Sequence, residues 1–120
     1  MKVLIVDDSK AIYMMVNQML TEAGHEGVWA EDGQKACDIL GEDKDIQVVL
    51  LDWNMPVMNG PEFLEKNQSD KVTEAPIIMM TTENKPDYIK KALSLGAVEY
   101  IMKPFTADIL FNKFELVDVE

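Results

Sequence analysis

The sequence has very little cysteine and histidine. Of its 120 residues, Cys37 is the one cysteine and His25 the one histidine. A single cysteine excludes an intrachain disulfide framework and is typical of a reducing compartment, so we expect a cytoplasmic protein. We expect Cys37 to be a small buried residue in a helix, and His25 to be a solvated loop residue and not a ligand.

Long apolar segments are also missing. No stretch approaches the ~20 consecutive apolar residues of a membrane span, so we expect no membrane association. The apolar start at residues 1–6 is too short for the core of a signal peptide, and two acidic residues follow it.

Positive charge is scarce. The chain carries 11 Lys or Arg residues against 22 Asp or Glu residues, a net charge of −11. A surface of this sign repels nucleic-acid phosphates, so we expect no nucleic-acid partner. Two explanations of the acidity stay open at this point: solubility, or a concentration of carboxylates that holds a cation.

Short apolar segments alternate with amphipathic ones along the chain. Five segments rich in Val, Ile, Leu or Met predict buried strands at 2–6, 27–30, 46–52, 76–81 and 98–102. The segments that follow them show helical spacing of apolar residues. Strict alternation with right-handed crossovers gives a doubly wound, five-stranded parallel α/β sheet with helices on both faces. We expect one domain covering residues 1–120.

Capping residues delimit the predicted helices. Three polar residues are placed to cap a helix: Ser9, Asn84 and Thr106. Three glycines are placed to end one: Gly24, Gly41 and Gly96. Gly60-Pro61 opens the third helix, because proline is tolerated at the first helical position. Helical spacing predicts that Leu93 and Ile109 face the core.

Polar side chains follow four of the five predicted strands. Asp7-Asp8 follows the first strand, Asp52 closes the third, Thr81 closes the fourth, and Lys103-Pro104 follows the fifth. Ligands of open α/β sheets bind beyond the carboxyl ends of the strands. We therefore expect these residues to meet at one edge of the sheet.

Three carboxylates at one edge have a definite chemistry. They repel one another and raise one another's pKa, and a hard divalent cation removes that repulsion. A carboxylate beside Mg²⁺ can attack a phosphoryl group and become an aspartyl phosphate. A lysine and a hydroxyl group can hold the remaining phosphoryl oxygens. The pattern predicts magnesium-dependent phosphoryl chemistry centred on Asp52.

Together with the stretch 52–60 (DWNMPVMNG) and the stretch 103–107 (KPFTA), these residues resemble the receiver domain of two-component response regulators. The resemblance covers essentially the whole chain and is strongest to the stand-alone chemotaxis members. It implies the flavodoxin-like (βα)5 fold with strand order 2-1-3-4-5 and a cis Lys103-Pro104 peptide. It also implies a signalling switch that assists its own phosphorylation and dephosphorylation, and not an enzyme acting on an outside metabolite.

The resemblance implies a role for each acidic residue. Asp52 is expected to accept the phosphoryl group from a sensor histidine kinase of the chemotaxis type. Asp8, Asp52 and the backbone carbonyl of Asn54 are expected to bind Mg²⁺, for which Mn²⁺ can substitute. Asp7 is expected to act mainly through metal-bound water.

The remaining site residues are expected to bind the phosphoryl group, respond to it and set how long it lasts. By the same resemblance, Lys103 pairs with the phosphoryl group and Thr81 donates its hydroxyl to it. Tyr100 occupies the position of the switch aromatic, which turns inward as Thr81 moves. Asn54 and Glu83 occupy the positions that tune dephosphorylation, and their polar character implies a short-lived phosphoryl state.

The expected target docks on the surface of the fourth helix, fifth strand and fifth helix, as the flagellar motor switch would, and a phosphatase is a further expected partner. One alternative is a phosphorelay intermediate that passes its phosphoryl group to a histidine phosphotransfer protein. A haloacid-dehalogenase-like phosphatase is disfavoured, because Asn54 stands where its second acid would be. A flavodoxin-like cofactor binder is disfavoured, because Asp7-Asp8-Ser9 would repel a phosphate that lacks a metal.

Overall fold

The computed structural model describes residues 1–82 and 85–117, and within these ranges strands and helices alternate strictly. Their bounds in chain order are β1 (Lys2–Val6), α1 (Lys10–Glu22), β2 (Glu26–Ala30), α2 (Gly33–Glu42), β3 (Ile46–Asp52), α3 (Gly60–Asp70), β4 (Ile77–Thr81), α4 (Pro86–Ser94), β5 (Glu99–Met102) and α5 (Ala107–Leu116). None of the helices in this part of the chain is long and apolar enough to cross a bilayer.

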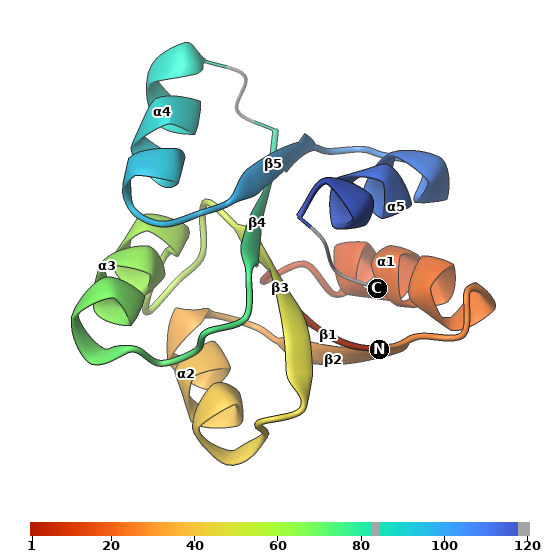
Figure 1. The fold of residues 1–120 in the computed structure, drawn as a ribbon, viewed down its shortest axis with the longest axis horizontal. Coiled ribbons are helices and arrows are strands. Elements are labelled where there is room, and N and C mark those ends of the chain that lie inside the picture. Colours follow the sequence, from red (N-terminus) through yellow and green to blue (C-terminus); the bar gives the residue numbers. More distant parts are fainter. Residues whose placement is uncertain (83–84, 118–120) are drawn as a thin grey trace.

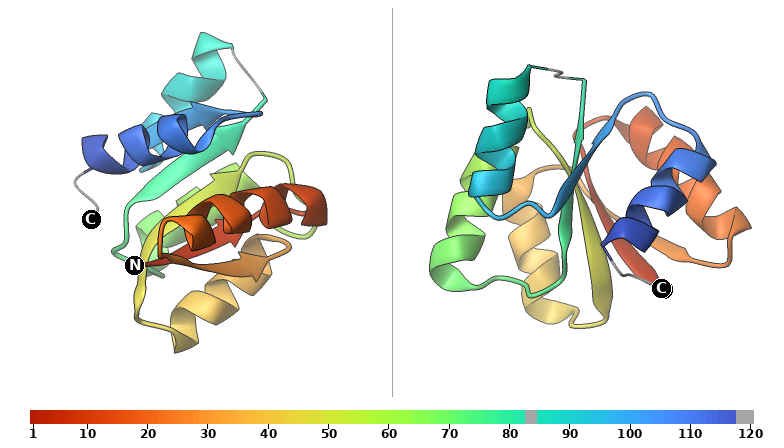
Figure 2. Two further views of the ribbon diagram at one scale, coloured as in Figure 1. Left: turned by 90° about the vertical axis from the view of Figure 1, so that its right-hand side faces the viewer. Right: turned by 45° about the horizontal axis from the view of Figure 1, so that its top comes forward.

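The strands form one parallel sheet in the order β2-β1-β3-β4-β5. Helices α2, α3 and α4 cover one face of this sheet, and α1 and α5 cover the other (Figures 1 and 2). The predicted doubly wound fold and its strand order are confirmed. The order matters for the site, because it makes β1 and β3 neighbours although 39 residues of chain separate Val6 from Ile46.

Two hydrophobic clusters fill the space between the sheet and its two layers of helices. Val49 and Leu51 of β3 point into the cluster under α2, α3 and α4, whereas Val48 and Leu50 point into the cluster under α1 and α5. The central strand β3 is therefore buried on both faces, which explains its nearly uninterrupted apolar sequence. Asp52 ends this strand at the sheet edge and is itself buried.

Two of the predicted helix caps are present. The hydroxyls of Ser9 and Thr106 accept backbone N–H bonds from Ile12 and Ile109, at 3.3 and 3.4 Å. The third predicted cap, Asn84, lies outside the described residues. Glycines follow α1 and α4 in the left-handed conformation, with φ +84° at Gly24 and +113° at Gly96, as predicted.

Gly41 does not end its helix. Helix α2 runs through it to Glu42, and the Asp43 N–H bonds to the carbonyl of Ile39 at 2.7 Å. Glycine lowers helix stability without forbidding a helix, and here the following hydrogen bond outweighs that cost.

Two residues predicted to face the core are exposed. The exposed fractions are 43% for Leu93 and 45% for Ile109. Each adjoins the residue that does face the sheet, Ala92 in α4 and Leu110 in α5. Since one residue turns a helix by about 100°, the neighbour of a buried position lies at the edge of the apolar stripe.

The expectations for His25 and Cys37 need correction. His25 is half-buried: its Nδ1 lies 3.0 Å from the amino group of Met1, and its ring packs against Phe111 with centroids 5.8 Å apart. Cys37 packs against the core from α2 but stays partly accessible.

Candidate functional site

Three carboxylates converge at the carboxyl edge of the sheet. Asp7 and Asp8 follow β1, Asp52 closes the neighbouring β3, and one oxygen from each lies within 4.8 Å of the others. Asp7 and Asp52 are buried, whereas Asp8 is exposed. The convergence expected from the strand ends is therefore present.

Lys103 joins two of these carboxylates. Its Nζ donates to Oδ2 of Asp7 and to Oδ1 of Asp52, both at 3.0 Å. Its backbone N–H donates to the carbonyl of Thr81 at 2.8 Å, which fixes the end of β5 against the end of β4. The Lys103-Pro104 peptide is cis, as predicted. The structure thus brings a cation from the far end of the chain between two buried acids.

Three further hydrogen bonds hold Asp7 in place. Its N–H donates to the carbonyl of Ala30 at 3.0 Å, and its Oδ1 accepts from the N–H of Ser9 at 2.8 Å. Its own carbonyl accepts from the indole N–H of Trp29 at 2.8 Å. The last contact could not be predicted from the sequence, because an aromatic residue in a strand ordinarily predicts packing.

The loop after β3 is tied back to the site. Oδ1 of Asp52 accepts from the Trp53 N–H at 2.9 Å, and the Trp53 carbonyl accepts from the Gly60 N–H at 3.0 Å. A side chain at Gly60 would bring its Cβ to 2.5 Å from the carbonyl oxygen of Asp52. Helix α3 begins there with a capping box between Asn59 and Glu62.

A tight turn lies within this loop. The Met58 N–H bonds to the carbonyl of Pro56 at 2.7 Å, two residues back, and Val57 between them has φ +66°. This is a γ-turn with a positive central φ, a strained conformation for a β-branched residue. The Gly33 N–H donates to the carbonyl of Met58 at 3.0 Å, so the loop is also hydrogen-bonded to the start of α2.

Burial and neighbouring charges shift the pKa values of Asp52 and Lys103. Burial raises the pKa of Asp52, and the nearby charge of Asp7 raises it further, while bonds from Lys103 and the Trp53 N–H partly offset both effects. Burial alone would lower the pKa of Lys103, but its hydrogen bonds to Asp7 and Asp52 outweigh this, and the pKa is raised. Lys103 therefore stays positively charged between the two acids at neutral pH.

The hydroxyl and aromatic residues of interest share one small hollow beside the acids. Thr81, Trp53, Tyr88 and Tyr100 all line it. Thr81 is buried at the end of β4, and Tyr100 is half-buried on β5 under the Nζ of Lys113, 5.0 Å from its ring centroid. The structure thus places Thr81 and Tyr100 together, next to the residue that follows Asp52.

Asn54 and Glu83 are the two residues expected to tune dephosphorylation. Asn54 is exposed in the loop, two residues beyond Asp52. Glu83 lies outside the described residues.

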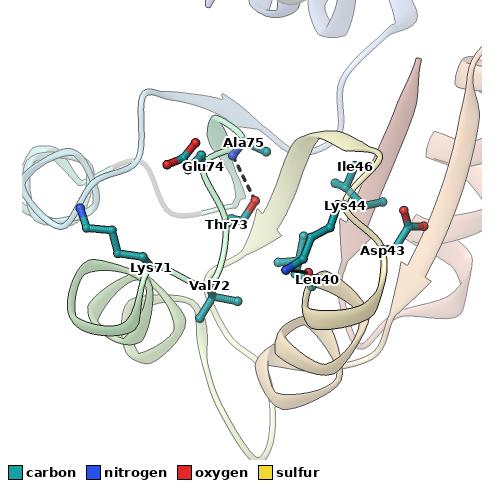
Figure 3. A pocket seen from close by; sticks show the side chains of 9 residues that line it. All are labelled: Leu40, Asp43, Lys44, Ile46, Lys71, Val72, Thr73, Glu74 and Ala75. Carbon is teal, nitrogen blue, oxygen red and sulfur yellow. Dashed lines mark hydrogen bonds between the residues drawn. The ribbon is translucent and has the colours of Figure 1, made fainter.

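A larger hollow of about 430 Å³ lies at the opposite, amino-terminal edge of the sheet (Figure 3). It lies between the end of α2 and the segment before β4, and its lining combines Lys44 and Lys71 with Asp43 and Glu74. The acid cluster is not part of its lining. The chemistry of the strand ends is therefore separate from this cavity.

The donor set at the carboxyl edge suits a hard cation. The three converging side chains offer oxygen ligands alone, and Asp8 is open to solvent, so bound water can complete a coordination shell. A buried carboxylate beside such a cation is also suited to accept a phosphoryl group.

Comparisons with known proteins agree on one family. The model of the response regulator receiver domain matches residues 3–115. A chemotaxis protein CheY homolog of Campylobacter jejuni is 44% identical over 117 residues, covering 96% of this chain and 90% of that protein. Chemotaxis protein CheY1 of Helicobacter pylori is 42% identical, covering 98% and 96%. The solved structure of Vibrio cholerae CheY4 has a TM-score of 0.87 at 36% identity over 97% of both chains. The chain belongs to the family of response regulator receiver domains.

Proposed function

We propose that this chain is a single receiver domain, residues 1–120, that switches by magnesium-dependent phosphorylation of Asp52. The observation that carries the proposal is the meeting of Asp7, Asp8, Asp52 and Lys103 at one sheet edge, from three separate parts of the chain. Family membership supports it, because receiver domains act as signalling modules. The acidic balance of the chain and its single cysteine favour a cytoplasmic protein that does not bind nucleic acid.

Asp52 is the proposed nucleophile. One of its carboxylate oxygens attacks the phosphorus of a phosphohistidine on a sensor histidine kinase, forming the O–P bond as the P–N bond breaks. The fixed position of Asp52 supports this role, because Asp52 ends a strand buried on both faces and its carboxylate accepts a bond from the Trp53 N–H. Lys103, now bonded to Asp52 Oδ1, is placed to pair with the incoming phosphoryl oxygens.

Asp8, Asp52 and the backbone carbonyl of Asn54 would hold Mg²⁺, or Mn²⁺ in its place, with Asp7 acting through metal-bound water. When bound, the metal would neutralise charge on the phosphoryl oxygens. Asp7 and Lys103 keep each other fixed, which leaves Asp8 with its exposed carboxylate as the most accessible ligand.

Thr81 and Tyr100 are the proposed switch. The Thr81 hydroxyl would donate to the phosphoryl group, and Tyr100 would move into the hollow that both residues line. Asn54 and Glu83 would tune the rate of dephosphorylation, which would occur at Asp52 itself and with the help of a phosphatase. The protein is thus a signalling component and not an enzyme with an outside substrate.

We further propose a role in chemotaxis, with the exposed face of α4, β5 and α5 docking a target such as the flagellar motor switch. Exposed apolar side chains that a partner could cover lie on α4, just before β5 and on α5, namely Tyr88, Leu93, Val98 and Ile109. The relatives whose names state chemotaxis support this reading. Passage of the phosphoryl group to a histidine phosphotransfer protein is the alternative outcome of the test.

The decisive experiment adds acetyl phosphate, with and without Mg²⁺, and measures intact mass and Trp53 fluorescence. The wild type should gain one phosphoryl group, and its emission should change only with Mg²⁺ present. Asp52→Asn should do neither, whereas Asp38→Asn on the exposed side of α2 should behave as the wild type. Modification of Asp52→Asn to the same extent would contradict the proposal. Phosphate-dependent binding of a motor-switch peptide separates chemotaxis from a relay, which would show efficient transfer to a phosphotransfer histidine instead.

A further inference from the structure

We infer that Trp29 is a positioning residue for the acid pair, because its indole N–H holds the peptide that links Asp7 to Asp8. The inference rests on the proposed metal site. Trp29 comes from the edge strand β2, 22 residues beyond Asp7, and the distance from its Nε1 to the Asp7 carbonyl oxygen is 2.8 Å. That distance is within the range of well-formed N–H···O bonds.

The accepting carbonyl belongs to a buried residue. Asp7 is 1% exposed, so water cannot readily replace the indole as its partner. A buried carbonyl that loses its donor bears a desolvation cost and tends to turn toward another donor. Loss of the indole N–H would therefore favour rotation of this peptide.

Rotation of this peptide would move Asp8. The carbonyl of Asp7 and the Cα of Asp8 lie in one rigid peptide plane, so the direction of the carbonyl sets where the Asp8 side chain begins. The other contacts of Asp7 do not hold this peptide: its N–H, which donates to Ala30, belongs to the preceding peptide, and the bonds from Ser9 and Lys103 act on its carboxylate. Asp8 is exposed, so its placement depends chiefly on its backbone.

The indole is itself held in one orientation. Its ring stacks on Tyr13 of α1, with centroids 5.2 Å apart and planes 13° apart, while its backbone pairs with Ile5 of β1. Among the described residues, neither core cluster includes Trp29. Its side chain thus bridges α1 and the β1–α1 turn and does not fill the core, which is the arrangement expected of a support for the acid pair.

The test is the Mg²⁺ affinity of Trp29→Phe, measured by titrating Mg²⁺ against backbone amide chemical shifts. Phenylalanine keeps an aromatic ring against Tyr13 but has no N–H to donate. We expect the Mg²⁺ dissociation constant to be three to ten times larger than that of the wild type. This is less than the roughly 10- to 100-fold loss of affinity that follows removal of a group bonded directly to a ligand side chain. Phe111→Leu is the matched control: it removes an aromatic contact with His25 outside the acid cluster and should lower the melting temperature without changing the Mg²⁺ affinity.

Three results separate the inference from the proposed function. A larger Mg²⁺ dissociation constant in Trp29→Phe, with no change in Phe111→Leu, supports the inference. Wild-type affinity in Trp29→Phe, with a melting temperature lowered as in Phe111→Leu, would show that Trp29 only packs and would overturn it. Failure of the wild type itself to bind Mg²⁺ would overturn the proposed metal site and the inference with it.

Discussion

The ring of Trp53 meets the ring of Tyr88 edge to face, with centroids 5.4 Å apart and planes at 67°. Trp53 directly follows Asp52, and Tyr88 lies in the first turn of α4. One aromatic contact therefore connects the neighbour of Asp52 to helix α4. A change at Asp52 that shifts Trp53 must also change the packing of α4.

Tyr88→Ala should expose the Trp53 indole and shift its fluorescence to longer wavelength, because the Tyr88 ring covers one edge of it. The aromatic pair contributes about 0.5–1.5 kcal/mol beyond its buried area, so a small loss of stability should accompany the shift. Emission spectra recorded in a Trp29→Phe background isolate Trp53, since the chain has two tryptophans. An unchanged spectrum would mean that the two rings do not touch in solution.

Asp52→Asn should raise the melting temperature of the metal-free protein at pH 7. Burial and the charge of Asp7 raise the folded-state pKa of Asp52 above its unfolded value. The folded protein then binds more protons between the two values, so stability falls as pH rises through the folded pKa, and the ionised carboxylate is a net cost at neutral pH. The advantage of asparagine should shrink toward pH 4, near the unfolded carboxyl value.

Thermal denaturation in EDTA at pH 7 and at pH 4.5 measures this difference. Lys103→Met provides a control of opposite sign, because it leaves Asp7 and Asp52 without their shared cation. Removing one partner of a buried ion pair costs roughly 3–5 kcal/mol, and this site lies toward the lower end because the side chains of Lys103 and Asp52 each keep 11% exposure. A destabilised Asp52→Asn variant would show that the bond to Lys103 outweighs burial.

His25→Gln should flatten the loss of stability on the acid side of neutrality. Burial lowers the pKa of His25, and the positive amino group of Met1, 3.0 Å from Nδ1, lowers it further. The unfolded chain therefore binds the imidazole proton more readily than the folded one, so stability is full above about pH 6.5 and declines as pH falls through the folded pKa. Urea unfolding at pH 7.5 and 5.5 should show a larger decline for the wild type than for the variant.

Gly60→Ala should destabilise the protein strongly, whereas Gly41→Ala should stabilise it. A Cβ at Gly60 would lie 2.5 Å from the Asp52 carbonyl oxygen and 3.1 Å from the Trp53 Cα, both in the backbone. A Cβ at Gly41 meets nothing within 4 Å and lies inside α2. We expect a loss of about 2 kcal/mol or more at Gly60 and a gain of about 0.5–1 kcal/mol at Gly41, measured by urea unfolding. Equal effects of the two substitutions would contradict the close approach at Gly60.

Val57→Asn should stabilise the loop by about 1 kcal/mol. Val57 has φ +66° and is 79% exposed, so valine is strained there and loses little packing on replacement. Asparagine tolerates the left-handed region better than any β-branched residue. Urea unfolding reports the gain, and Val98→Asn is a control at an exposed valine without a positive φ. A loss of stability in Val57→Asn would show that the side chain has contacts that outweigh its backbone strain.

The sequence predicted the sheet well because its signals are local. The run 46–52 became β3 without a change of bounds, since seven residues buried on two faces leave little freedom in composition. Helix ends were less secure. The sequence predicts a helix end at Gly41, yet the energetic penalty of glycine within a helix is only about 1 kcal/mol, and the hydrogen bond from the Asp43 N–H to the Ile39 carbonyl offsets it.

The acid cluster was predictable because strand ends share an edge, but its internal contacts were not. Nothing in the sequence near Lys103 indicates that its ammonium bridges Asp7 and Asp52. Nothing in the sequence indicates the hydrogen bond from the Trp29 indole to the Asp7 carbonyl either. Such pairs depend on side-chain directions between segments tens of residues apart, which periodicity does not encode.

Lys103 lies between Asp7 and Asp52 and supplies one positive charge to the acid cluster. By formal charge, three carboxylates and one ammonium leave two negative charges at the sheet edge, the amount that one divalent cation cancels. On the proposed function, this edge would be formally neutral with its cation bound, and a phosphoryl group on Asp52 would add negative charge that no group of the cluster balances. The proposed phosphorylation would therefore change the charge of this edge from a formally neutral starting point.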